Sequence, residues 1–78
     1  MATVAYILIE VTADKTKGVL TKLQKVRGVK AAHAVTGPFD IIATVEAEDV
    51  KGLGDIVLSK VRTIDGVEKT ITCVAVEA

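Results

Sequence analysis

The sequence predicts an α+β fold, in which four antiparallel strands form one sheet and two helices cover one face of it. Three observations carry this prediction. Four segments are rich in β-branched and other apolar residues, and two segments between them carry apolar residues at helical spacing. Their order along the 78 residues is strand, helix, strand, strand, helix, strand, and a chain of this length has room for one domain, residues 1–78.

The first strand is expected over residues 3–11, where TVAYILIEV has apolar side chains at both odd and even positions. This pattern is typical of a strand that is covered on both faces. The first helix is expected from about Asp14 to Arg27. Thr12 or Asp14 can cap its start, Gly28 can end it, and one apolar stripe runs along it, formed by Val19, Leu20, Leu23 and Val26.

The segment VTGPFD, residues 35–40, joins two strand-like runs, VKAAHAVTG and DIIATVEAE, and predicts a hairpin. Glu48 or Asp49 can cap the second helix. Gly52 and Gly54 weaken its first turn, but its apolar residues keep helical spacing, at Val50, Leu53, Val57, Val61 and Ile64. The last strand, VEKTITCVAV, follows Gly66, and alternation puts its side chains on two faces, with Ile71, Cys73 and Ala75 on one and Thr70, Thr72, Val74 and Val76 on the other.

The two halves of the chain repeat one plan, because a Gly-Val pair follows each helix and starts the returning strand, at residues 28–29 and 66–67. The order β-α-β-β-α-β is the ferredoxin-like plan, and right-handed crossovers place both helices on one face of the antiparallel sheet. The first and third strands are apolar on both faces, so the second face would expose a patch that soluble monomers rarely tolerate. We therefore expect a homodimer packed through that sheet face, with a higher homo-oligomer formed through edge strands.

Composition and charge disfavour several classes of protein. Half of the residues are hydrophobic, but only Tyr6 and Phe39 are aromatic, so the strands lack the aromatic platform of an RNA-binding sheet. Ten basic residues balance ten acidic residues, so neither nucleic acid nor an anionic membrane is an expected partner. The apolar runs are far shorter than the roughly 20 residues that span a bilayer, and the N-terminus lacks the features of a signal peptide. A cytoplasmic location is expected.

No set of residues predicts catalysis, a metal site or a bound cofactor. His33 has no histidine, cysteine or paired carboxylate nearby, so a surface or partly packed histidine is the better interpretation. Cys73 lies between Thr72 and Val74 in a strand pattern and is expected to be a core thiol. The segment KGLGD, residues 51–55, lacks the third glycine and the strand-to-helix setting of a dinucleotide loop, and a loose helix start explains it.

The turn VTGPFD contains residues that suit the recognition of a small zwitterion. Gly37 allows close backbone approach, the turn can expose an amide, and Asp40 can accept a hydrogen bond from an ammonium group. A plain turn explains the same residues, because Pro38 suits position i+1 of a type I turn and Asp40 can start the third strand. Residue types and spacing leave both interpretations open.

A longer pattern resembles a known family. The segments YILIEV, GVKAAHAVTGPFDIIATVEAED and VLSKVRTIDGVEKTITCVAV together resemble the effector-binding (RAM) domain of the leucine-responsive, or Lrp/AsnC, transcription regulators over almost the whole chain. The most specific part is VTGPFDIIATVEAED, which is similar to that family's V-T-G-x-x-D segment. Full-length members carry an N-terminal helix-turn-helix domain, whereas this sequence opens directly into its first strand, so it resembles a stand-alone effector module.

The resemblance implies a domain that dimerises through its sheets and binds amino acids or related small molecules at subunit interfaces. Carried over by position, it implies that the turn side of the pocket is formed by Thr36, Gly37, Phe39 and Asp40. It also implies polar contacts from the last strand, supplied by another subunit, at Thr70 and Thr72. Pro38 stands at a variable position of the motif.

The leading hypothesis is a regulatory module that binds an amino acid, oligomerises and modulates a full-length Lrp/AsnC regulator, without contacting nucleic acid directly. Ligand binding would then shift assembly. The first alternative is a purely structural oligomerisation module with a vestigial site. The second is a dimeric α/β-barrel enzyme, which the single histidine and the lack of a clustered acid-base set disfavour.

Overall fold

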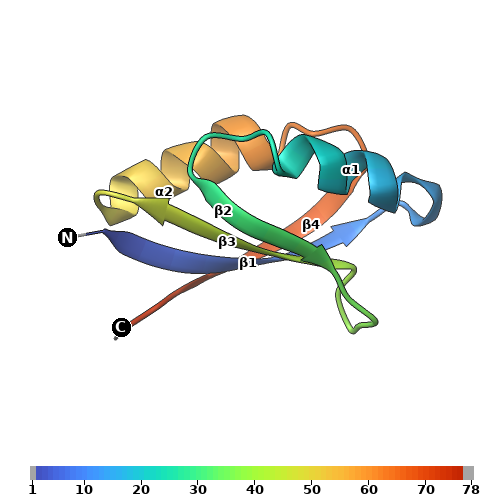
Figure 1. Ribbon diagram of the computed structural model, residues 1–78, viewed down its shortest axis with the longest axis horizontal. Helices are drawn as coiled ribbons and strands as arrows, with labels where there is room; N and C mark the ends of the chain where they lie inside the picture. Colours follow the sequence, from blue (N-terminus) through green and yellow to red (C-terminus); the bar gives the residue numbers. More distant parts are fainter. Residues whose placement is uncertain (1, 77–78) are drawn as a thin grey trace.

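The computed structural model describes residues 2–76 and contains the six expected elements in the expected order. The four strands are β1 (Thr3–Val11), β2 (Val29–Ala34), β3 (Ile41–Ala47) and β4 (Val67–Val74). A short 3₁₀ turn, η1 (Ala13–Lys15), precedes helix α1 (Thr16–Leu23), and helix α2 (Val50–Ile56) continues as a π-helical segment, η2 (Val57–Val61). Both helices lie on the same side of the sheet (Figure 1).

Each pair of neighbouring strands is antiparallel, and the order across the sheet is β2-β3-β1-β4. The inner strands are therefore β1 and β3, and the edges are β2 and β4. This is the ferredoxin-like arrangement, so the fold class predicted from the sequence is confirmed.

The core lies between the sheet and the helices. Alternate side chains of β1 and β3 point towards the helices and are fully buried, namely Ala5, Ile7, Ile9, Ile41, Ala43 and Val45. The expected helical stripes supply the opposite wall, through Val19, Leu23, Leu53, Val57 and Val61. Burial of each large aliphatic side chain stabilises the fold by about 1.5 to 3 kcal/mol, so this layer accounts for the position of both helices.

The other face of the sheet is apolar, no layer formed by residues 2–76 covers it (Figure 1), and we call it the open face. The strand registers place Tyr6 there next to Cys73, and Leu8 between Ile42 and Ile71. Tyr6 is 47% exposed and Ile71 is 37% exposed. The expectation of a core thiol is wrong, because Cys73 lies on the open side of an edge strand and is exposed.

The structure confirms one of the two capping predictions. The carboxylate of Asp49 accepts a hydrogen bond of 2.7 Å from the amide of Gly52 and so caps α2. At the first helix, Thr12 makes no side-chain capping bond, and its hydroxyl instead donates to Glu68 Oε2 at 2.9 Å. That bond ties the end of β1 to the beginning of β4.

The first helix is shorter than expected at both ends. The α-helical pattern begins at Thr16, because Ala13–Lys15 form the tighter turn η1. It ends at Leu23, because the amides of Lys25 and Val26 bond to carbonyls only three residues earlier. Such three-residue bonds tighten the last turn of a helix and end it.

Gly28 and Gly66 occupy equivalent places, directly before β2 and β4. Both have positive φ angles, +100° and +103°. A Cβ on Gly28 would lie 2.7 Å from Ile56 Cδ1, and a Cβ on Gly66 would lie 2.8 Å from Lys15 Cβ. Both the backbone conformation and the close packing require glycine, which explains the repeated Gly-Val pair.

An ion pair connects η1 to the turn before β4. Lys15 Nζ lies 2.6 Å from Asp65 Oδ2, and this hydrogen bond lowers the pKa of Asp65 and raises the pKa of Lys15. The stability that the pair contributes is therefore lost as the pH falls through the lowered pKa of Asp65, or rises through the raised pKa of Lys15. Both side chains are exposed, so salt screens the interaction.

Gly28→Ala should lower the free energy of unfolding by about 1 kcal/mol or more. Alanine is strained at this positive φ angle, and its Cβ would also clash with Ile56. Gly18→Ala is the matched control, since Gly18 lies inside α1 and a Cβ there would meet nothing within 4 Å. This change should raise stability by up to about 1 kcal/mol. Urea unfolding at one protein concentration measures both, and an unchanged Gly28→Ala variant would contradict the argument.

Candidate functional site

The hairpin turn between β2 and β3 extends beyond one end of the sheet (Figure 1). A hydrogen bond of 2.9 Å from the amide of Val35 to the carbonyl of Asp40 closes it. The peptide bond between Gly37 and Pro38 is cis, unlike the bond before a proline at position i+1 of a type I turn. Gly37 has a φ of +142°, and a Cβ there would meet no atom within 4 Å, so glycine is needed for the backbone conformation and leaves room beside it.

Asp40 joins this turn to the end of β1. Its amide donates to the carbonyl of Ile9 at 3.0 Å, and its Oδ2 accepts a hydrogen bond of 2.9 Å from the amide of Val11. The side chain thus extends the pairing of β1 and β3 by one backbone group, a structural role that the sequence did not reveal. No side chain or amide among residues 2–76 donates to Oδ1 of Asp40, so this oxygen can accept a bond from a ligand.

The other expected residues of the turn directly precede Asp40 in the sequence. Thr36 and Gly37 are exposed, whereas Phe39 is half-buried, like Asp40 itself. A carboxylate, a hydroxyl and the backbone amides of a glycine-containing turn therefore lie within five consecutive residues. These groups match the charges of a zwitterion.

Thr70 and Thr72 lie elsewhere, on the edge strand β4. They are opposite Ile9 and Ile7 of β1, so their side chains point to the helix side of the sheet. They line a groove of about 340 Å³ between β4 and the second helix, and no residue of the turn lines this groove. Within one chain, the structure does not bring the two expected groups of site residues into one pocket.

The groove, which we call the α2–β4 groove, has two walls. Its helix wall is formed by Val50, Leu53, Gly54, Val57, Leu58 and Arg62. Its strand wall is formed by Thr70, Thr72 and Val74. None of the residues of β4 is buried, so the two helices leave this edge of the sheet uncovered.

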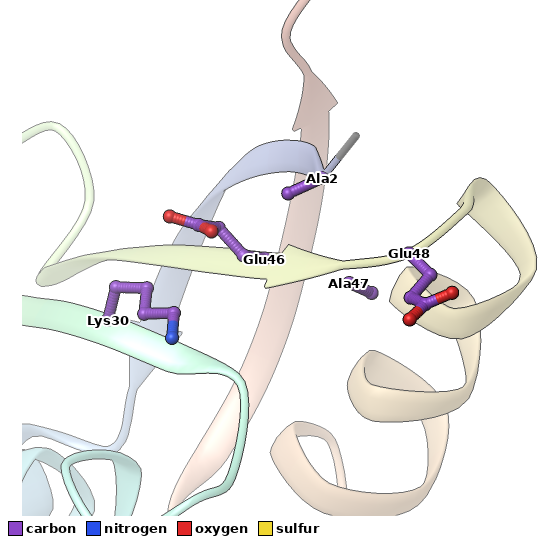
Figure 2. Close-up of a pocket in the computed structure, with 5 residues that line it drawn as sticks. All are labelled: Ala2, Lys30, Glu46, Ala47 and Glu48. Carbon is purple, nitrogen blue, oxygen red and sulfur yellow. The ribbon is translucent and has the colours of Figure 1, made fainter.

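A second hollow, of about 410 Å³, lies at the end of β3 that is remote from the turn. Figure 2 shows its lining, which consists of Ala2, Lys30, Glu46, Ala47 and Glu48. The ammonium group of Lys30 and the carboxylate of Glu46 point in different directions in this view. None of the residues expected to bind a ligand lies here.

The described residues carry few other groups that suit chemistry. Among residues 2–76, no three His, Cys, Asp or Glu side chains gather as metal ligands would. His33 is exposed and pairs with Ile42 across the hairpin, which confirms its interpretation as a surface residue. In the same stretch of chain, no helix has the length and apolar character needed to cross a membrane.

Sequence reasoning missed Arg62, which stands at one end of the α2–β4 groove. A signal for it was present. Val50, Gly54, Leu58 and Arg62 follow one another at intervals of four residues, and residues four apart lie on the same side of a helix. This row lies beside the buried stripe and borders the groove.

Comparison with known proteins decides the family. A family model described as the Lrp/AsnC ligand binding domain matches residues 4–78. The chain belongs to the Lrp/AsnC family. An uncharacterised HTH-type transcriptional regulator from Pyrococcus furiosus is 36% identical over an alignment that covers 96% of this chain and 52% of that protein. This Lrp/AsnC domain thus spans about half the length of the curated relatives it matches.

Solved structures share the fold. A protein from Thermus thermophilus has a TM-score of 0.93 and 30% identity, over 97% of this chain and 95% of that one. E. coli AsnC has a TM-score of 0.92 and 25% identity, over 97% of this Lrp/AsnC chain and 52% of its own. A transcriptional regulator from Neisseria meningitidis, solved as a complex with L-Met, has a TM-score of 0.87 and 18% identity, over 96% and 50%, which shows the fold alone.

Asp40→Ala should lower the free energy of unfolding by about 1 to 3 kcal/mol, because the amide of Val11 loses its acceptor. Asp40→Asn should cost less, since an amide oxygen can accept the same hydrogen bond. Thr36→Ala, at an exposed position of the same turn, is the control and should change stability little. Urea unfolding measures the free energy of unfolding of all three variants. Equal losses of stability in Asp40→Asn and Asp40→Ala would show that the hydrogen bond to Val11 does not account for the effect.

Proposed function

We propose that this chain is an effector-binding regulatory module, which binds an amino acid or a similar small molecule and changes its assembly on binding. The family and its HTH-type relatives are transcription regulators, which gives the class of function. The observation that carries the proposal is the position of Asp40, whose half-buried carboxylate uses one oxygen within the chain and keeps the other at an exposed turn. A carboxylate held in this way is a suitable partner for an ammonium group.

The ligand would lie against the turn between β2 and β3. Its ammonium group would donate to Asp40, and its carboxylate would accept bonds from the backbone amides near Gly37 and from the hydroxyl of Thr36. The half-buried ring of Phe39 offers an apolar contact for the ligand's side chain. The complex of the Neisseria meningitidis regulator with L-Met supports an amino acid as the class of effector.

Thr70 and Thr72 would contact this ligand from another subunit. In a single chain they lie on the helix side of β4, in a groove that no residue of the turn lines. Assembly therefore has to bring a turn and a β4 edge of different copies together. A ligand held between copies would stabilise the assembled state by mass action.

The open face would form the homodimer, and the exposed edge strands would allow a higher homo-oligomer. The open face is apolar, with Tyr6 and Ile71 among its exposed side chains. Covering this face removes apolar area from water, which is the main favourable term in association. The partner in regulation would be a full-length Lrp/AsnC regulator in the cytoplasm, which would supply the contacts to DNA, because this chain has a formal net charge of zero.

A purely structural oligomerisation module with a vestigial site is the alternative. Thr36 and Gly37 are exposed, and the Asp40 bond to Val11 would hold the turn together without any ligand. A thermal-shift screen against the common amino acids separates the two functions, since only a binding module is stabilised by one of them. The regulatory nature of the family points away from the third candidate, a dimeric α/β-barrel enzyme.

The protein should be at least a dimer in solution, with a mass of twice the 8.2 kDa of one chain or more. Leu8→Lys should reduce this mass, because it places a charge at the centre of the open face. Thr21→Lys is the matched control, since Thr21 is exposed on α1 and lies neither on the open face nor in the α2–β4 groove, so its replacement should leave the dimer intact. Light scattering at micromolar concentration measures all three, and a monomeric wild type would remove both the dimer and the site between subunits.

Asp40→Asn should weaken binding of the amino acid found in the thermal-shift screen by roughly ten- to a hundredfold, because the ammonium group loses a charged acceptor. Thr72→Val should weaken it less, by roughly fivefold, since a neutral hydroxyl bond contributes about 1 kcal/mol. Titration calorimetry on the wild type and both variants gives the affinities, with circular dichroism as the control for folding. Unchanged affinity in Asp40→Asn would move the site away from the turn.

A further inference from the structure

The α2–β4 groove contains more than the two threonines that the proposed amino-acid site uses. Its exposed wall residues are mainly aliphatic, and Val50, Leu58 and Val74 are 62%, 58% and 40% exposed. Beneath them lie Leu53 and Val57, which are nearly fully buried. An apolar strip of this kind, open to water on one side, favours an occupant with an aliphatic portion.

The groove has an apolar end and a cationic end. The chain enters α2 from the end of β3, near the place where Val74 pairs with Ala5, and then runs back along β4 (Figure 1). Val50 therefore lies towards Val74, and Arg62, which follows η2, lies towards Thr70. From Thr70 to Val74 the strand wall extends over about 13 Å, at about 3.3 Å per residue.

Charge complementarity selects the occupant. Arg62 is the one charged residue that lines the groove in the described part of the chain, and no carboxylate lines it. Glu68 lines the adjoining hollow with Arg62, but it accepts a hydrogen bond from Thr12, and no ion pair joins it to Arg62 within residues 2–76. The guanidinium group is thus available to a carboxylate, which it can hold with two parallel bonds.

We propose that the α2–β4 groove is a second binding site, which takes a small aliphatic monocarboxylate. Arg62 holds the carboxylate, the hydroxyl of Thr70 lies at the same end, and the carbon chain extends along the aliphatic wall towards Val50 and Val74. An ammonium group on the ligand is unfavourable here, because no acidic residue among residues 2–76 lines the groove to receive it.

A second copy of the chain that covered the whole groove, including its Arg62 end, fits less well than one whose turn reaches only Thr70 and Thr72. A protein surface that covered the groove would bury the guanidinium of Arg62, which is costly unless the partner brings an acid to the same place. A small carboxylate brings its own charge and leaves the outer side of Arg62 in water. The carboxylate site needs no residue of the Asp40 turn, so it can exist without the amino-acid site, although both proposed sites use hydroxyls of β4 in this groove.

Four probes test the proposal: hexanoate, octanoate, hexylamine and 2-aminohexanoate. Each is titrated into the whole chain, and two-dimensional NMR spectra record the shifts of the amide signals. Octanoate should shift the amide signals of β4 and η2, and it should bind roughly fifteenfold more tightly than hexanoate, at roughly fourfold for each buried methylene. Hexylamine should leave these signals unchanged. Equal effects of octanoate and hexylamine, or octanoate shifts confined to the open face, would overturn the proposal.

Arg62→Gln should weaken octanoate binding by roughly ten- to a hundredfold. Arg62→Lys keeps the charge at the end of the helix but lacks the planar pair of donors, so its affinity should fall between those of Arg62→Gln and the wild type. Arg27→Gln, at an exposed arginine outside this groove, is the matched control and should bind as the wild type does. Octanoate affinity unchanged by Arg62→Gln would overturn the proposal.

The Asp40→Asn variant distinguishes this site from the amino-acid site. Octanoate should bind this variant as tightly as it binds the wild type, whereas 2-aminohexanoate should shift the η2 signals less than hexanoate does in both proteins. The β4 signals are not used for this comparison, because Thr70 and Thr72 of β4 also belong to the proposed amino-acid site. Loss of octanoate binding in Asp40→Asn would show that the carboxylate occupies the turn, and would overturn a separate site. Failure of the amino-acid site alone would appear as intact octanoate binding with no amino-acid binding in the wild type.

Discussion

The central strand β1 is apolar on both sides, and the rest of the structure follows from that constraint. Ala5, Ile7 and Ile9 are fully buried beneath the helices, while Tyr6 and Leu8 point to the open face. A chain of this size buries only about 60% of the surface that its unfolded form exposes, so two helices cannot cover both faces of the sheet. The apolar area of the open face is therefore available for association, and in the proposed dimer one strand would link stability to assembly.

The same strand positions the turn that is proposed to bind the ligand. The carbonyl of Ile9 receives the amide of Asp40, and the amide of Val11 donates to its carboxylate. A functional carboxylate on a loop usually needs support from a rigid element, and here the last backbone groups of β1 supply it. The cost is that Asp40 has two roles, so removal of its side chain changes the fold and the site together, while Asn separates the two.

The fold was predictable from the sequence because its signals are local and repeated. Two-sided apolar runs indicate buried strands, and apolar stripes indicate helices packed on one side. The Gly-Val pairs mark places where the backbone needs a positive φ angle, and the φ angles of Gly28 and Gly66 are +100° and +103°. Cys73 was misplaced because alternation assigns a residue to a face of a strand but does not tell which face is covered. The structural role of Asp40 and the place of Arg62 depend on contacts between distant segments, and a pattern in one sequence does not contain these.

The α2–β4 groove and the Asp40 turn lie on opposite sides of β1, yet one residue connects them. Ile9 pairs with Thr70 in the register of β1 and β4, and its carbonyl accepts the amide of Asp40. A hydrogen-bonded sheet of this kind has one stable arrangement, whereas an allosteric switch needs a structural element with two alternative arrangements. Ligands at the two proposed sites would therefore be coupled weakly within a chain, and strong coupling would require the contacts between copies to change.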